Sequence, residues 1–234
     1  TQVESGKVAV RPDGSLVLFD EPEDDTPEIE KYINQAVHKD IKLDETFKYD
    51  VLAYVTKDAD DVVITDELVA DLAFVSKEEE VKVEDLGEDD NHKVTNNIAA
   101  EKINDDATVA ATGTSVANAV AAIKGQTLTV TIPDATAVRG HWVRVTFEAK
   151  IAEGKTIADL KNSNIKLNDP VISDEEHTGV PNTASYKIGV KGIKLNEDGT
   201  PVLDENGNPV KEENTTPKYE DESNTVTVKT GVEV

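Results

Sequence analysis

The sequence contains no cysteine and no methionine, and both absences limit what the chain can be. Without cysteine it forms no disulfide bond and no cysteine-based metal or redox centre. If the chain works outside the cell, something other than a disulfide must cross-link it. Because the sequence also lacks an initiator methionine, we expect it to be a mature or excised part of a longer protein.

Basic residues and long apolar runs are scarce as well. The 24 lysines and arginines face 48 acidic residues, which gives a formal net charge of -24. Nucleic acids and anionic membranes repel a polyanion of this kind. No apolar run approaches the roughly 20 residues of a membrane span. We therefore expect a soluble fragment with neither nucleic acid nor a membrane as its partner.

Short runs of alternating apolar and polar residues dominate what is there, and Gly, Pro, Asp and Asn separate them. The runs are KVAV, SLVLF, FKYDVLAYV, DVVITDEL, EEVKVEDL, QTLTVTI, WVRVTFEAKI, ASYKIGV and NTVTVK. Regular spacing of short strands is typical of an all-β sandwich or barrel, and we predict a β-sandwich. The alanine-rich stretch 114–125 is compatible with a short helix or a buried connection, and its periodicity does not decide between them.

Turn residues divide the chain. Asp-Gly in RPDGS predicts a leading hairpin, and DEPEDDTP predicts an acidic linker, so residues 1–27 are assigned to a hairpin and linker. Residues 28–234 are assigned to the sandwich. The two turn motifs of NEDGTPVLDENGNPV predict a hairpin insertion at about 191–218.

Three polar residues fall on apolar rows of the expected strands, because side chains alternate between the two faces of a strand. Asn182 begins the row that continues with Ala184 and Tyr186. Lys31 lies between Ile29 and Ile33 on its row, and Asp66 follows Val62 and Ile64 on another. The pattern thus assigns a lysine, an aspartate and an asparagine to one interior.

This combination has a chemistry of its own. An apolar environment lowers the pKa of a lysine, and the neutral amine is a nucleophile. A protonated carboxylic acid can polarise the asparagine carboxamide and relay protons to the departing nitrogen. Attack of the amine on the amide carbon then releases ammonia and leaves an isopeptide bond, without any cofactor.

The sequence resembles the isopeptide-forming Ig-like domains of Gram-positive pilins and fibrillar surface adhesins. The motifs IEKYIN, FKYDVLAYV, ITDELVADLAFV, WVRVTFEAKI and PNTASYKI occur in the family's order, over about residues 28–190, with 215–230 completing the sheet. The resemblance implies a collagen-adhesin-like β-sandwich in which a lysine of the first strand is joined to an asparagine of the last. Carried onto this chain, the cross-linked residues are Lys31 and Asn182, and Asp66 assists.

Two other acids compete for the assisting role. Asp50 shares a row with Leu52 and Tyr54, and Glu148 interrupts the strand VTFEAKI. Asp66 ranks first because the rest of its row is apolar.

Other chemistry finds no support in the sequence. The histidines His38, His92, His141 and His177 lie in different segments without metal-ligand spacing. We find no nucleophile elbow and no phosphate-binding glycine loop. We therefore expect no metal, no cofactor and no turnover of an external substrate, only a single self-catalysed reaction.

The resemblance implies a structural stalk or pilin-like module of a cell-wall-anchored extracellular adhesin, with neighbouring domains of the same protein as partners. The alternative is an adhesin domain that binds a host matrix protein or glycan. Aromatic residues make up only 4% of the chain, which favours the stalk because recognition surfaces are rich in aromatic hot spots.

Overall fold

The computed structural model describes the backbone of residues 7–10 and 16–19, together with residues 24–34, 36–88, 113–161 and 178–231. Within these residues, strands form almost all of the regular structure. The strands are β1 (Lys7–Val10), β2 (Leu16–Phe19), β3 (Glu28–Ile33), β4 (His38–Ile41), β5 (Thr46–Tyr54), β6 (Asp61–Glu67), β7 (Leu72–Phe74), β8 (Lys82–Gly87), β9 (Thr114–Ser115), β10 (Val120–Lys124), β11 (Thr127–Ile132), β12 (Trp142–Ile151), β13 (Val180–Asn182), β14 (Ala184–Val190), β15 (Thr216–Glu222) and β16 (Val226–Thr230). The helical elements are α1 (Ile157–Lys161) and the 3₁₀ turns η1 (Glu78–Glu80) and η4 (Thr136–Val138).

One sheet of the sandwich has five antiparallel strands in the order β10-β11-β6-β14-β15. Its central strand β6 follows the pattern expected of a sheet with one buried face, because Val62, Ile64 and Asp66 are buried and the residues between them are not. β14 repeats this pattern with Ala184 and Tyr186. The alternation predicted from the sequence is confirmed for both strands.

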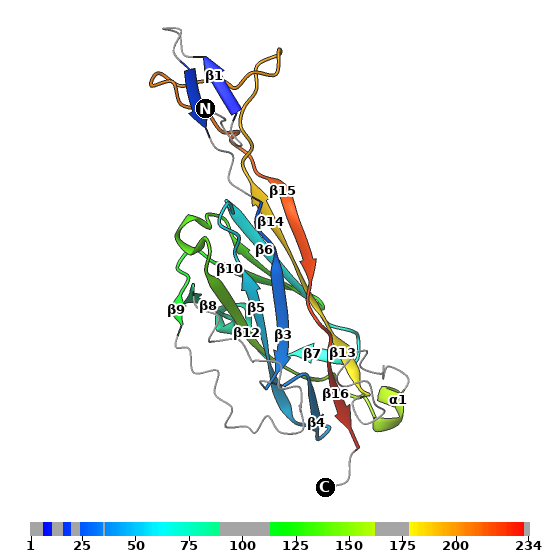
Figure 1. Cartoon of the computed structure of the whole chain (residues 1–234). Coiled ribbons are helices and arrows are strands. Elements are labelled where there is room, and N and C mark those ends of the chain that lie inside the picture. Colours follow the sequence, from blue (N-terminus) through cyan, green and yellow to red (C-terminus); the bar gives the residue numbers. More distant parts are fainter. Residues whose placement is uncertain are drawn as a thin grey trace.

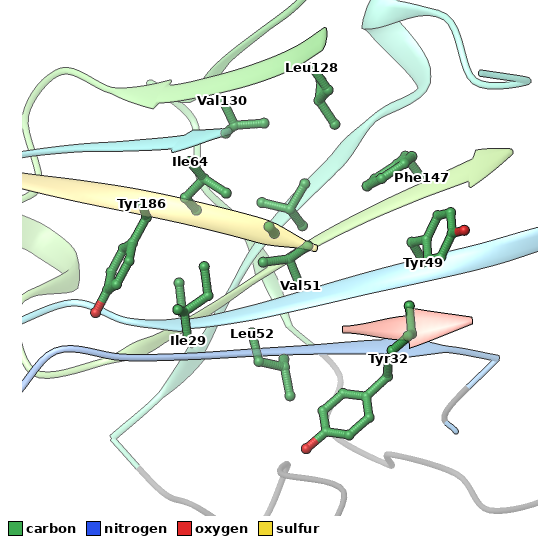
Figure 2. Packing of buried hydrophobic residues seen from close by; sticks show 14 of the residues in the cluster. Ile29, Tyr32, Tyr49, Val51, Leu52, Ile64, Leu128, Val130, Phe147 and Tyr186 are labelled. Atoms are coloured by element: carbon green, nitrogen blue, oxygen red, sulfur yellow. The ribbon is translucent and has the colours of Figure 1, made fainter. Parts of the chain in front are cut away.

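The second sheet has the order β3-β5-β12-β8-β9, and β7 pairs with the end of β12. Its central ladder joins β5 to β12 without a break from Thr46–Lys150 to Tyr54–Trp142. The middle of β5 is buried on both faces, since Asp50, Val51, Leu52 and Ala53 are all covered. Figure 2 shows the result: Tyr49 and Val51 project into the core beside Phe147, whereas Leu52 and Tyr32 project from the other side of their strands.

A small third sheet, β13-β16-β4, lies near the end of β3. β16 runs antiparallel to β13 and parallel to β4. Asn34 makes the turn out of β3 with a positive φ of 43°, a conformation that asparagine tolerates better than most residues. The turn lies between β3 and β4, which is the strand that pairs with β16.

The all-β sandwich is thus confirmed, whereas the alanine-rich stretch differs from both interpretations of it. Residues 120–124 form the edge strand β10, in which Val120 remains 59% exposed. The strand pairs with β11 from Val120–Thr131 to Lys124–Thr127. This pairing along the sheet edge outweighs the low strand propensity of alanine.

The predicted domain division stays a prediction. β1 and β2 do pair as an antiparallel hairpin, which lies at the opposite end of the molecule from β16 (Figure 1). The last residues of the predicted linker are tied to the sandwich, because the Asp25 carboxylate accepts hydrogen bonds from the Tyr54 hydroxyl at 2.8 Å and the Lys57 amide at 3.0 Å.

Between β14 and β15, isolated bridges such as Leu195–Pro201 and Leu203–Pro209 mark two consecutive turns. Among the described helical elements, none has the length and apolar character needed to cross a membrane.

Candidate functional site

Lys31 lies at the middle of edge strand β3 with its side chain pointing into the sandwich. Its neighbours on the same row, Ile29 and Ile33, are core residues, so the strand's alternation carries the lysine inward. The residue has 0% exposure. Burial lowers the pKa of the Lys31 amine below 10.5, and the nearby carboxylate of Asp66 only partly opposes that shift.

Asp66 meets Lys31 from the opposite sheet. Its Oδ2 pairs directly with the Lys31 Nζ, and the two side chains are 2% and 0% exposed. The other carboxylate oxygen, Oδ1, is buried and has no hydrogen-bond partner among the described residues. Such an oxygen is costly to bury, so the site holds one unused acceptor beside the amine.

Asn182 ends β13, two residues before Ala184, which is the cross-strand partner of Asp66 on β6. The residue is only 3% exposed. Within the described chain, neither its Oδ1 nor its Nδ2 makes a hydrogen bond. A buried carboxamide without partners is rare, because each unpaired polar atom carries a desolvation penalty.

Two aromatic rings complete the pocket. The Lys31 Nζ lies 4.2 Å from the ring centroid of Tyr49 and 5.1 Å from that of Phe147. These rings come from β5 and β12, where the two residues are cross-strand partners. They exclude water from the amine, which is the condition that lowers its pKa.

The two competing acids lie elsewhere. Asp50 is the cross-strand partner of Tyr32 and not of Lys31, so its side chain leaves β5 on the opposite face. There it accepts a hydrogen bond of 2.6 Å from the Thr146 hydroxyl. Glu148 is exposed. Of the three acids, Asp66 is the one that the structure brings to the lysine.

Sequence reasoning missed Tyr49, Phe147 and Asn224. Tyr49 lies on a wholly apolar row with Val51 and Ala53, whereas the opposite row carries Lys48 and Asp50. This contrast is the signal that could have identified the inward face of β5. The Asn224 side chain contacts the backbone of Lys31 across 193 positions of sequence. Local periodicity cannot reveal a contact at that range.

The described histidines contact neighbouring polar side chains. His38 contacts Thr227 and Asp40, and His141 contacts Asp85. His92 and His177 lie outside the described residues. No group of three or more potential metal-ligating side chains occurs within the described ranges.

The fold has solved counterparts. A structure of BcpA, the major pilin subunit of Bacillus cereus, superposes with a TM-score of 0.50 at 16% identity, covering 96% of this chain and 47% of that one. A second BcpA structure, which carries an aspartate-to-alanine substitution, gives a TM-score of 0.51 at 16% identity and covers 97% and 48%. The chain has the fold found in a Gram-positive major pilin.

The match extends over about half the length of BcpA. The full-length major pilin SpaD of Corynebacterium diphtheriae also matches, with a TM-score of 0.42 at 16% identity, covering 96% of this chain and 44% of SpaD. No protein-family model and no curated protein matches the sequence.

Proposed function

We propose that this chain is a load-bearing stalk or pilin-like module of a Gram-positive surface protein, locked by an isopeptide bond between Lys31 and Asn182 that Asp66 helps to form. The observation that carries the proposal is the buried Lys31–Asp66 pair in one core with an asparagine whose carboxamide has no partner. The fold it shares with the BcpA pilin supports the same function.

The reaction balances without a cofactor. Proton transfer within the Lys31–Asp66 pair gives a neutral amine and a carboxylic acid. The Nζ attacks Cγ of Asn182, a new C–N bond forms, and the bond from Cγ to Nδ2 breaks. The acid supplies a proton to the departing nitrogen and takes one from the attacking amine, so that ammonia leaves and the acid is regenerated.

The isopeptide bond would provide the covalent cross-link that a chain without cysteine cannot obtain from disulfides. Using the chain-entropy estimate for a disulfide of comparable span, closing the loop from Lys31 to Asn182 stabilises the fold by roughly 5 kcal/mol. That is comparable with the whole net stability of many domains. An extracellular module without cysteine gains most from such a covalent tie.

Asn182 does not lie on the last strand, so the proposed bond would not join the first strand to the last as the family resemblance implies. Three strands, β14, β15 and β16, follow Asn182 along the chain. Only the segment between Lys31 and Asn182 is therefore enclosed by the bond. Under tension the enclosed segment stays closed, while residues 183–231 are held by hydrogen bonds and packing alone.

Single-molecule pulling from both ends tests this function. The residues outside the closed loop, 1–30 and 183–234, can extend by roughly 280 Å in total, and the enclosed segment would add about 500 Å more if it were free. We expect the native chain to release only the shorter length, and the Asn182→Ala chain to release both. Release of the full length by the native chain would contradict a load-bearing bond at this place.

The partners proposed for such a module are neighbouring domains of the same extracellular protein. The rival function, recognition of a matrix protein or glycan, requires a binding surface. The large apolar side chains exposed within the described ranges are scattered over separate segments, at Leu43, Val69, Val120, Ile157 and Leu195. A pull-down with immobilised matrix proteins separates the two functions, because a spacer retains none of them.

A further inference from the structure

The hydroxyl of Tyr49 stands apart from those of the other tyrosines. The chain has five tyrosines, all within the described ranges. Four of their hydroxyls donate hydrogen bonds: Tyr32 to Glu30, Tyr54 to Asp25, Tyr186 to the Tyr54 carbonyl, and Tyr219 to Asp58. The Tyr49 hydroxyl is buried without a hydrogen-bond partner in the described chain. Burying a hydroxyl without a partner destabilises the fold, so a functional role explains its presence better than a structural one.

The location of the Tyr49 hydroxyl indicates what this role is. Ile33 follows Lys31 on the inward row of β3, and Tyr49 is the cross-strand partner of Ile33. The centroid of the Tyr49 ring lies 4.2 Å from the Lys31 Nζ. The Asn182 side chain is close enough to lower the pKa of the Tyr49 phenol, although the two groups form no hydrogen bond of standard geometry. Burial and the charge of Asp66 outweigh that effect and raise the phenol's pKa well above 10.0, so the hydroxyl keeps its proton.

We propose that Tyr49 is a further catalytic residue of the cross-linking reaction, and that its hydroxyl donates a hydrogen bond to Oδ1 of Asn182 as that oxygen becomes an oxyanion. This inference rests on the proposed function. When the Lys31 amine adds to Cγ, the electron pair of the carbonyl bond moves onto Oδ1. The Tyr49 hydroxyl donates to this oxygen and retains its proton, and collapse of the intermediate expels Nδ2 as ammonia with a proton from Asp66.

The unpaired state of the two groups before reaction agrees with this role. A donor that is poorly engaged with the ground-state amide and engaged with the charged intermediate lowers the barrier instead of stabilising the reactant. Catalytic hydrogen bonds are often long until the transition state forms. A ring that served only to cover the lysine would need no hydroxyl, since Phe147 covers it at 5.1 Å without one.

Tyr49→Phe is the direct test, because it keeps the ring and removes only the hydroxyl. Tyr32→Phe is the matched control: it removes a hydroxyl from a buried tyrosine that faces away from the site, toward Glu30. Each chain is synthesised in a cell-free system and quenched in denaturant at intervals. The fraction that has lost ammonia is then followed by intact mass.

Loss of one oxyanion donor typically slows a reaction about 10²–10³-fold, so we expect a fall of that order for Tyr49→Phe and an unchanged rate for Tyr32→Phe. An unchanged rate for Tyr49→Phe overturns the assignment while leaving the cross-link intact. If the native chain never loses ammonia, the proposed function itself fails, which is a different outcome.

A second measurement separates catalysis from folding. In an Asp66→Asn background, where no cross-link forms, adding Tyr49→Phe should leave the melting temperature unchanged or raise it, because the hydroxyl makes no hydrogen bond before reaction. A lower melting temperature would identify the hydroxyl as a structural group and overturn the proposal.

Discussion

Asn224 holds the backbone of Lys31 with both polar atoms of its side chain. Its Oδ1 accepts from the Lys31 amide and its Nδ2 donates to the Lys31 carbonyl, each at 2.9 Å. The side chain therefore pairs with edge strand β3 as a neighbouring strand would. Two residues later, Val226 is the cross-strand partner of Asn182. One short segment thus contacts the backbone of both reacting residues.

Replacing Asn224 by Ala should slow cross-linking, because the edge of β3 loses both contacts and the lysine is held less firmly before the reaction. In a chain that cannot cross-link, the same change should cost about 1–3 kcal/mol of unfolding free energy. Time-resolved intact mass and chemical denaturation measure the two effects. Thr183→Ala removes a neighbouring contact, a hydroxyl pair with Thr225 at 2.6 Å, and is the control for general loosening. Equal rates for the two variants would show that Asn224 has no special role.

Asp66→Asn should fold and remain unmodified, because an amide cannot exchange protons with the attacking and leaving nitrogens. General acid–base assistance contributes about 10²–10⁴-fold to a rate, so little product should form over hours. Glu148→Gln is the matched control, since its exposed carboxylate lies outside the site. Asp50→Asn should also cross-link. Loss of the reaction in Asp50→Asn alone would transfer the assisting role to Asp50.

The Asn182→Ala chain should be less stable than the native chain by roughly 5 kcal/mol, the contribution estimated for the closed loop. For a domain of this size that corresponds to a melting temperature lower by about 10–20 °C. Calorimetry on both chains measures the difference. Equal melting temperatures would mean that the native chain carries no bond at Asn182.

In a chain that cannot cross-link, the buried amine should make stability depend on pH. The pKa of Lys31 is lowered from 10.5 in the folded state, so between the folded-state value and 10.5 the unfolded chain binds a proton that the folded chain lacks. The free energy of unfolding therefore rises with pH in that window. Asn182→Ala should gain stability relative to the double variant Lys31→Met, Asn182→Ala as the pH rises from neutrality. A flat or falling difference would contradict a neutralised buried lysine.

Sequence patterns predicted the parts of the fold in which one face of a strand is buried. The alternation of β6 identified the inward side chain of Asp66, and the alternation that runs from β13 into β14 identified that of Asn182. In β5 the wholly apolar row of Tyr49, Val51 and Ala53 indicated the inward face, although Asp50 was kept as a competitor and Tyr49 was overlooked. The burial of the opposite row could not be predicted from the pattern, because that row carries Lys48 and Asp50. The alanine-rich β10 carries little local preference and takes its strand conformation from its partner β11.

Intact-mass spectrometry of the purified native chain tests the central claim most directly. Joining the Lys31 amine to the Asn182 amide expels one ammonia, so the mass should fall about 17 Da below that of the sequence. Lys31→Ala and Asn182→Ala should each show the full mass of the variant. A proteolytic digest should contain one branched peptide that joins the segments around residues 31 and 182. A native chain at its full sequence mass, with no branched peptide, would contradict the account.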